Sequence, residues 1–239
     1  MKVDILAFGV HPDDVELGCG GAIISSIKQG KKVAVVDLTR GELGTRGTAE
    51  TRDAEAAAAA NILNLSAREN LQMEDGFFEI NESNLLKVIS VIRKYQPEVL
   101  ICNAPADRHP DHGRSAKLVL DACFLSGLLK IETTFEEKLQ EAWRPKLVFQ
   151  YIQDELLKPD FIFDITNAYE QKTASILSYK TQFNATDNGP QTYISSPQFL
   201  KIVEARAIEF GKRIGVAYGE GYITQKSLGI DSFDKFIAK

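Results

Sequence analysis

The stretch VDILAFGVHPDDVELGCGG, residues 3–21, joins a predicted strand to the first polar motif of the chain. Residues 3–10 are almost entirely apolar, which is typical of a strand that is buried on both faces of a sheet. Residues 15–30 follow and predict a helix that is closed by a glycine. Pro12 favours an extended conformation for His11 and suits the first position of a helix. The stretch therefore predicts a strand, a polar turn and a helix at the beginning of the fold.

The same alternation continues along the first half of the chain. Strands are predicted at 31–39, 69–75 and 98–104, and helices at 50–65, 84–95 and 113–130. This order predicts an α/β, Rossmann-like fold with a mostly parallel, twisted sheet and helices on both faces. The second half predicts strands at 146–152 and 161–166 and helices at 168–183 and 197–215. We expect one domain, residues 1–239, with the motifs in about 1–130 and a polar loop, 184–196, that covers the site.

The composition excludes several classes of function. Lys and Arg number 28 and Asp and Glu 33, a net charge of −5 that argues against broad nucleic-acid binding. The 3 cysteines form no CxxC pair and suit a reducing compartment. The apolar N-terminal run is too short for a signal peptide, and no segment reaches the ~20 apolar residues of a membrane span. We therefore expect a cytoplasmic protein without a membrane partner.

Two similar motifs contain all 3 histidines of the chain. HPDD begins at His11 and HPDH begins at His109, and each follows a predicted strand. Because the carboxyl ends of parallel strands share one edge of a sheet, the motifs should meet there. A single His-Pro-Asp is usually a turn with a helix cap, but the repetition favours a metal site. Imidazole and carboxylate suit Zn²⁺, so we interpret His11, Asp14 and His112 as ligands, with His109 as the alternative to His112.

The motifs resemble those of the LmbE-like, or PIG-L, family of zinc-dependent N-acetylglucosamine deacetylases. The matching segments are 11–21, 38–60, 73–78 and 107–113. Within the family, RGELGTRG and DRHPDHG look most like members that deacetylate N-acetyl-α-D-glucosaminyl L-malate in bacillithiol biosynthesis. The resemblance implies one Zn²⁺ per chain, with Fe²⁺ or another divalent metal as an alternative. It also implies a small-molecule substrate and a homo-oligomer such as a hexamer.

The resemblance supports the same ligand set and leaves the other polar residues of the motifs for catalysis. Asp13 is expected to take a proton from the zinc-activated water as general base. His109 is expected to stabilise the oxyanion as an imidazolium, which Asp111 orients and keeps charged. Asp13, or His109 as the alternative, then protonates the leaving amine. The expected products are acetate and a free glucosamine amine.

Four further residues are expected to bind the substrate. Arg52 matches a substrate-binding position of the family, and Arg108 is a second candidate for the malate carboxylates. Asp75 is expected to accept hydrogen bonds from sugar hydroxyls, and Tyr193 to reach over the substrate or the oxyanion. Arg46, by contrast, is interpreted as part of a solvated loop.

Other functions remain open or are disfavoured. A serine or cysteine hydrolase is disfavoured because the chain has no GxSxG and no cysteine in the histidine motifs. Gly18, Gly20 and Gly21 do not complete a dinucleotide fingerprint and favour close helix packing. A non-catalytic metal-binding module would leave Asp13 and His109 unexplained. Within the family, the alternatives are deacetylases of mycothiol precursors, of chitobiose, and of free or lipid-linked N-acetylglucosamine.

Overall fold

The computed structural model describes residues 1–183 and 189–236. Its centre is a seven-stranded sheet with the order β3-β2-β1-β4-β7-β9-β8. The strands are β1 (Ile5–Gly9), β2 (Val33–Thr39), β3 (Ala67–Met73), β4 (Val99–Cys102), β7 (Leu147–Tyr151), β8 (Phe161–Asp164) and β9 (Gly219–Thr224). The five strands from β3 to β7 are parallel, and β9 runs antiparallel to both of its neighbours. The predicted mostly parallel sheet is confirmed.

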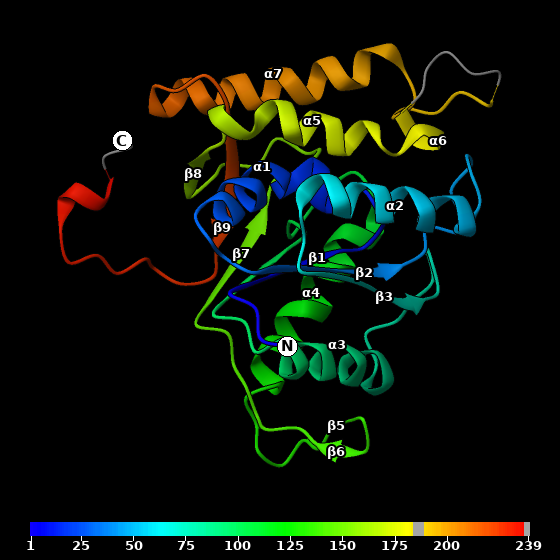
Figure 1. The fold of residues 1–239 in the computed structure, drawn as a ribbon, viewed down its shortest axis with the longest axis vertical. Coiled ribbons are helices and arrows are strands. Elements are labelled where there is room, and N and C mark those ends of the chain that lie inside the picture. Colours follow the sequence, from blue (N-terminus) through cyan, green and yellow to red (C-terminus); the bar gives the residue numbers. More distant parts are fainter. Residues whose placement is uncertain (184–188, 237–239) are drawn as a thin grey trace.

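Helices cover both faces of this sheet, as predicted (Figure 1). On one face lie α1 (Asp14–Lys28), α2 (Ala49–Leu63), α5 (Tyr169–Leu177), α6 (Lys180–Phe183) and α7 (Pro197–Ile214). On the other face lie α3 (Glu82–Tyr95) and α4 (Pro110–Leu125). In the part of the chain that the structure describes, no helix combines the length and apolar character needed to cross a membrane.

Side chains of β1 alternate between the two faces of the sheet. Leu6 and Phe8 pack in a core that includes Leu118 of α4. Ala7, between them, packs in the opposite core with Val15 of α1. This period of two is inherent in an extended strand, and burial on both faces accounts for the continuous apolar run. The run thereby fixes β1 in the centre of the molecule and holds the polar turn that follows it.

The first turns of α1 and α4 meet at the carboxyl edge of the sheet, because β1 and β4 are parallel neighbours. Pro110 occupies the first turn of α4 and His109 is the N-cap residue, so this helix begins before the predicted residue 113. Pro12, in contrast, lies before the start of α1. Asp13 is the N-cap residue there, with φ 122° and ψ −24°, and the helix begins at Asp14. Both His-Pro-Asp motifs therefore end in a helix N-terminus at the same edge.

The second half departs from the prediction in four places. The helix predicted over 168–183 is divided into a 3-10 turn, η1 (Thr166–Ala168), α5 and α6. Tyr179, between α5 and α6, is fully buried, and its hydroxyl donates to Oε1 of Glu16 at 3.1 Å. A hairpin of β5 (Thr134–Phe135) and β6 (Lys138–Leu139), the strand β9 and the terminal turn η2 (Phe233–Phe236) were not predicted. Of the predicted covering loop 184–196, residues 184–188 lie outside the described residues, and 189–196 form neither helix nor strand.

Candidate active site

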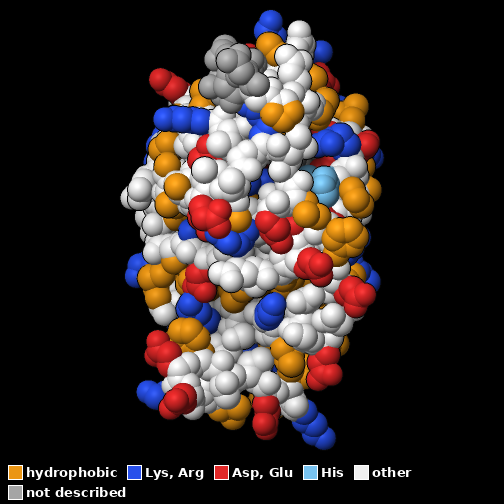
Figure 2. Space-filling view, turned by 90° about the vertical axis from the view of Figure 1, so that its right-hand side faces the viewer, with side chains coloured by type: hydrophobic (Ala, Val, Ile, Leu, Met, Phe, Trp, Pro, Cys, Tyr) orange, Lys and Arg blue, Asp and Glu red, His pale blue; other side chains and the backbone are white. Residues whose placement is uncertain are grey.

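A cavity of about 350 Å³ opens at the carboxyl edge of the sheet. Both His-Pro-Asp motifs line it, together with the 43–46 loop, the 152–154 segment and one side of α7. In Figure 2, histidine surface is visible at one place, among acidic and basic side chains. The cavity thus joins segments that are far apart in the sequence.

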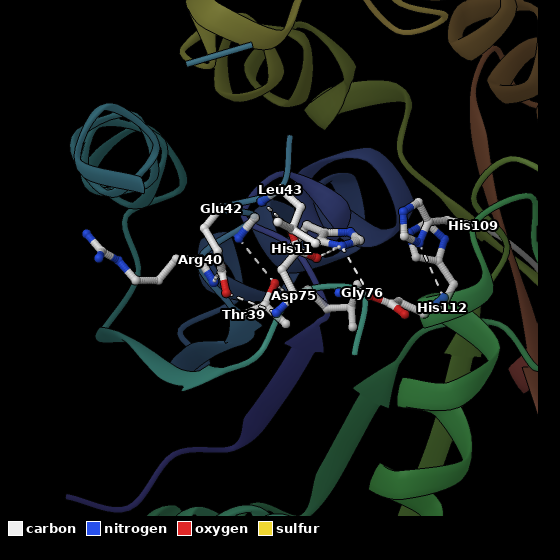
Figure 3. Close-up of polar contacts among 12 residues, drawn as sticks. His11, Thr39, Arg40, Glu42, Leu43, Asp75, Gly76, His109 and His112 are labelled. Atoms are coloured by element: carbon white, nitrogen blue, oxygen red, sulfur yellow. Dashed lines mark hydrogen bonds and ion pairs between the residues drawn. The ribbon is translucent and has the colours of Figure 1, made fainter. Parts of the chain in front are cut away.

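The 3 histidines form one cluster in this cavity. The ring centroids of His11 and His109 lie 4.7 Å apart, those of His11 and His112 5.7 Å, and those of His109 and His112 5.4 Å. Nitrogen atoms of all three rings lie within 4.8 Å of one another. Carboxylate oxygens of Asp75 and Asp111 form a second group of this kind with His11. The predicted meeting of the two motifs is confirmed (Figure 3).

Asp14 lies between two of these imidazoles. Its Oδ1 is 3.3 Å from Nε2 of His112, and its Oδ2 is 3.8 Å from Nδ1 of His11. Oδ2 also accepts hydrogen bonds from the backbone N–H groups of Val10 and His11, each at 3.0 Å. Burial raises the pKa of Asp14, but His112 and His11 outweigh it and hold the pKa well below its usual range. An ionised carboxylate therefore faces two imidazole nitrogens.

His112 is bound by two carboxylates in the described structure. Its Nδ1 lies 2.7 Å from Oδ2 of Asp107, while its Nε2 faces Asp14. Burial lowers the pKa of His112, but Asp14 and Asp107 together raise it to about 10. The site is therefore strongly attractive to positive charge, whether a proton or a metal ion.

Asp13 is held in a strained backbone conformation beside this cluster. Only 5% of its surface is exposed, and its Oδ2 accepts a 3.0 Å hydrogen bond from Nη2 of Arg52. Burial raises the pKa of Asp13 to about 7, although the positive charge of Arg52 opposes the shift. Arg52 also donates to the carbonyl oxygen of Pro12. Arg52 lines the cavity. Its hydrogen bonds in the structure are with Asp13 and with the backbone.

The structure differs from the expectation that Asp111 keeps His109 charged. The Asp111 carboxylate accepts hydrogen bonds from the Gly76 N–H at 2.8 Å and from Arg114 at 2.7 Å. It is the backbone N–H of Asp111 that donates to Nδ1 of His109, at 3.3 Å. Burial and the neighbouring His11 and His112 lower the pKa of His109. His109 is therefore a neutral ring with its proton on Nε2, rather than an imidazolium.

Asp75 lines the cavity and is bound within the protein. Its Oδ1 lies 3.0 Å from Nε2 of His11, and its Oδ2 accepts from the backbone N–H of Leu43 at 3.0 Å. Both carboxylate oxygens are therefore engaged within the protein. Burial raises the pKa of Asp75, but its hydrogen bond with His11 outweighs this and lowers the pKa.

Arg108 and Tyr193, both expected to bind the substrate, are exposed side chains that line the cavity. Nε of Arg108 is 2.9 Å from Oδ2 of Asp154, and the Tyr193 hydroxyl donates to Oδ1 of the same residue at 3.1 Å. The guanidinium carbon of Arg108 lies 4.8 Å from the centre of the Tyr193 ring. Arg206 of α7 joins the group, with Nη2 on the Asp154 carbonyl oxygen. These side chains form a mixed-charge rim.

Sequence reasoning missed several residues of the site. Asp107 belongs to the DRHPDHG motif, and its position five residues before His112 could have indicated that it belongs to the site. Gln153, which donates to Oδ1 of Asp14 at 2.8 Å, and Arg206 gave no recognisable signal. Arg46 is not a solvated residue: it is buried and donates to the Thr181 carbonyl oxygen at 2.6 Å. These contacts join segments whose proximity only the fold determines.

The donor set fits a divalent cation, because imidazole nitrogens and carboxylate oxygens converge on one side of the cavity. An acidic group of raised pKa, Asp13, lies next to them. An α/β sheet with these donor atoms and an adjacent acidic group at its carboxyl edge has the architecture of a metal-dependent hydrolase.

Comparison with known proteins gives a more specific assignment. Residues 6–123 match the PIG-L family model, described as GlcNAc-PI de-N-acetylase. The uncharacterized deacetylase YaiS of Escherichia coli is 33% identical over 125 residues, covering 50% of this chain and 67% of that protein. Diacetylchitobiose deacetylase of Thermococcus kodakarensis is 25% identical over 231 residues, covering 91% and 81%. The crystal structure of the conserved protein TT1542 from Thermus thermophilus superposes with a TM-score of 0.85 and 32% identity, covering 96% and 98%. The chain belongs to the PIG-L family.

Proposed function

We propose that this protein is a metal-dependent N-deacetylase that hydrolyses the acetamide of an N-acetylglucosamine derivative to acetate and the free amine. The proposal rests mainly on the position and conformation of Asp13. It is buried, has a positive φ and lies in the cavity beside the candidate metal ligands. A sparsely populated backbone conformation costs of order 1–3 kcal/mol and is retained mostly where function needs it. A non-catalytic metal-binding module gives no reason for this cost.

The metal would be held by His11, Asp14 and His112, with Zn²⁺ as the first candidate and Fe²⁺ as the alternative. A bound divalent cation supplies Lewis acidity toward a water molecule and a carbonyl oxygen. The low pKa of Asp14 keeps this carboxylate ionised for the cation. The Asp111 N–H donates to Nδ1 of His109, so Nε2 is the ring nitrogen that remains available for the substrate.

The remaining residues divide the proton transfers between them. The Asp13 carboxylate accepts the proton of the attacking water, and Arg52 holds its Oδ2 in place. The Nε2–H group of neutral His109 donates to the substrate carbonyl oxygen as negative charge develops on it. Protonated Asp13 then delivers its proton to the amine nitrogen as the C–N bond breaks. The balance is one water consumed and one acetate and one amine formed.

The preferred substrate is N-acetyl-α-D-glucosaminyl L-malate. Malate adds two carboxylates to the sugar, and guanidinium groups suit carboxylates in bidentate geometry. Arg108 and Arg206 both line the cavity near its opening. Asp154 pairs with these cations when no substrate is present, so substrate carboxylates would have to compete with it.

The experiment is an acetate-release assay with N-acetylglucosaminyl malate, N-acetylglucosamine and N,N'-diacetylchitobiose, each with metal-loaded and with chelated protein. We expect metal-dependent release that is fastest with the malate conjugate. Equal rates on all three compounds would remove the malate assignment and keep the deacetylase. Release that continues unchanged after complete metal removal, or no release from any compound, would reject the proposed function.

A matched variant sharpens the substrate test. Arg108→Ala should raise KM for the malate conjugate by about 10–100-fold, the value of a charge-assisted hydrogen bond, and leave KM for N-acetylglucosamine unchanged. An equal rise for both compounds would show that Arg108 supports the site and does not read the malate group.

A further inference from the structure

Each of two proposed metal-ligand imidazoles is bound on its second nitrogen by a buried carboxylate. Nδ1 of His112 lies 2.7 Å from Asp107, and Nε2 of His11 lies 3.0 Å from Asp75. The carboxylate side chains are 1% and 6% exposed. The remaining nitrogens, Nε2 of His112 and Nδ1 of His11, are the ones that face Asp14.

We propose that Asp75 and Asp107 are positioning residues that fix the ring orientation and the free nitrogen of His11 and His112. The inference rests on the metal site of the proposed function. A carboxylate that accepts the N–H of one ring nitrogen leaves the other nitrogen with its lone pair, which is the form a metal ion requires. The two carboxylates therefore select complementary tautomers, with the proton on Nδ1 in His112 and on Nε2 in His11.

Asp107 is itself held so that it cannot rotate. Its Oδ2 faces His112, while its Oδ1 accepts the backbone N–H groups of Arg108 and Glu155, both at 2.8 Å. Burial raises the pKa of Asp107, but its hydrogen bond with His112 outweighs this and lowers the pKa. Asp107 thus links His112 to the segment that contains Asp154 and Glu155.

Asp75 is fixed in the same way on the other side of the site (Figure 3). Besides His11, it binds the Leu43 N–H, and its own N–H donates to Glu42 at 2.9 Å. Asp111 is a second carboxylate near Nε2 of His11, but at 3.8 Å, and it is engaged by Arg114. Asp75 is therefore the group that orients the His11 ring.

The first test measures metal affinity in Asp75→Asn and Asp107→Asn, by competition of Zn²⁺ with a chelator and without substrate. An amide keeps the shape of the side chain and removes its charge. We expect each variant to bind one Zn²⁺ per chain with about 10–100-fold lower affinity, as is usual for such outer partners. The visible spectrum of the Co²⁺-loaded variants should keep the wild-type shape, because the atoms that bind the metal are unchanged.

Asp37→Asn is the matched control. Asp37 is also a buried carboxylate, and its described hydrogen bonds are with Arg68 rather than with a histidine. Its replacement should lower thermal stability and leave Zn²⁺ affinity unchanged. Thermal melts of all three variants separate weakened binding from general loss of structure.

A second readout uses the small number of histidines. In the Zn²⁺-loaded wild-type protein, two imidazole N–H protons bonded to carboxylates should appear downfield in the proton NMR spectrum. Asp107→Asn should shift or remove the His112 signal alone, and Asp75→Asn the His11 signal alone. A merely structural role for either aspartate would not produce this selectivity.

The outcomes separate the inference from the proposed function. If the wild-type chain binds no Zn²⁺, the metal site fails and the inference fails with it. If the wild-type binds and the folded variants bind equally well, only the inference is overturned. If Asp75→Asn abolishes binding and changes the Co²⁺ spectrum, Asp75 is a ligand, and its positioning role is overturned.

Discussion

At the scale of single residues, Asp13 is the most informative side chain. It follows Pro12, caps α1 with a positive φ and has its carboxylate against Arg52. A glycine would adopt such a backbone with less strain. An aspartate at this position, with its carboxylate in the cavity, is consistent with the general base of the proposed function.

Asp13→Asn should lower kcat by about 10²–10⁴-fold, the usual contribution of a positioned general base. The amide retains the shape of the carboxylate but cannot accept the proton of the attacking water. Zn²⁺ affinity should stay close to wild type, which distinguishes loss of the base from loss of the metal. Asp53→Asn, which removes an exposed partner of Arg40, is the control. Substantial activity in Asp13→Asn would contradict the assigned role.

The pH dependence of kcat/KM should have an acidic limb that reports Asp13. Burial raises the pKa of this group to about 7, and only its ionised form can accept a proton. Activity should therefore fall as the pH decreases through about 7, and a bound cation would move the limb to lower pH by stabilising the carboxylate. A rate that rises as the pH falls would assign the limb to another group.

The residues of the cluster differ in how far the sequence could predict them. His11, Asp14 and His112 lie in motifs placed directly after strands, so topology alone brings them together. Arg46 and Arg52 lie in a loop and at the beginning of α2, and a sequence does not show which acceptor a long side chain reaches. Arg52, which was expected to bind the substrate, lines the cavity, and its guanidinium also reaches Asp13 across 39 residues of sequence.

At the scale of elements, the glycines of α1 have different functions. A Cβ on Gly18 would lie 2.1 Å from the ring of Tyr151, which is fully buried in β7. A Cβ on Gly20 would have its nearest neighbour at 3.5 Å, in the flexible side chain of Lys172. The expected close packing thus holds for Gly18, whereas the space at Gly20 accommodates a methyl group.

Gly18→Ala should lower the free energy of unfolding by about 1–3 kcal/mol, the usual cost of overpacking. Gly20→Ala should instead raise it by up to about 1 kcal/mol, because alanine favours a helix. Thermal denaturation of the two variants should therefore shift in opposite directions. Equal destabilisation would mean that α1 tolerates no added side chain on either face.

The elements of the first half were predictable because each has a strong period or an apolar run. β9 was not, because its sequence GEGYIT begins with two glycines and a glutamate, residues that are depleted in strands, and only its second half favours a strand. The fold supplies the reason for them: a Cβ on Gly219 would lie 2.6 Å from Ile162, and one on Gly221 2.8 Å from the ring of Phe210. Tertiary packing therefore determines this strand, and its local sequence does not reveal it.

At the scale of the whole molecule, a buried ion pair within the second half of the chain also binds a helix of the first half. Nζ of Lys172 in α5 lies 2.6 Å from Oε1 of Glu220 in β9. Glu220 also accepts the backbone N–H groups of Gly21 and Ala22, and Lys172 donates to the Leu17 carbonyl oxygen. The pair therefore binds the middle of α1, the helix whose first residue is Asp14.

Glu220→Ala should destabilise the protein by about 3–5 kcal/mol, because Lys172 would remain buried without its counter-charge. Urea denaturation at neutral pH measures the change. Glu209→Ala, which removes an exposed ion pair on α7, should have a much smaller effect. Similar losses in the two variants would mean that the buried pair does not hold the halves together.

The position of β9 also has a consequence for synthesis on the ribosome. β8 is an edge strand of the seven-stranded sheet, and its partner there is β9, the last strand in chain order among the described residues. A nascent chain that ends before residue 219 already contains all three proposed metal ligands, but β8 still lacks β9, the strand with which it pairs. Every edge left open in that interval is a surface on which unfinished chains can join one another. Emergence of β9, rather than completion of the motifs, is therefore the step that allows β8 to join the seven-stranded sheet.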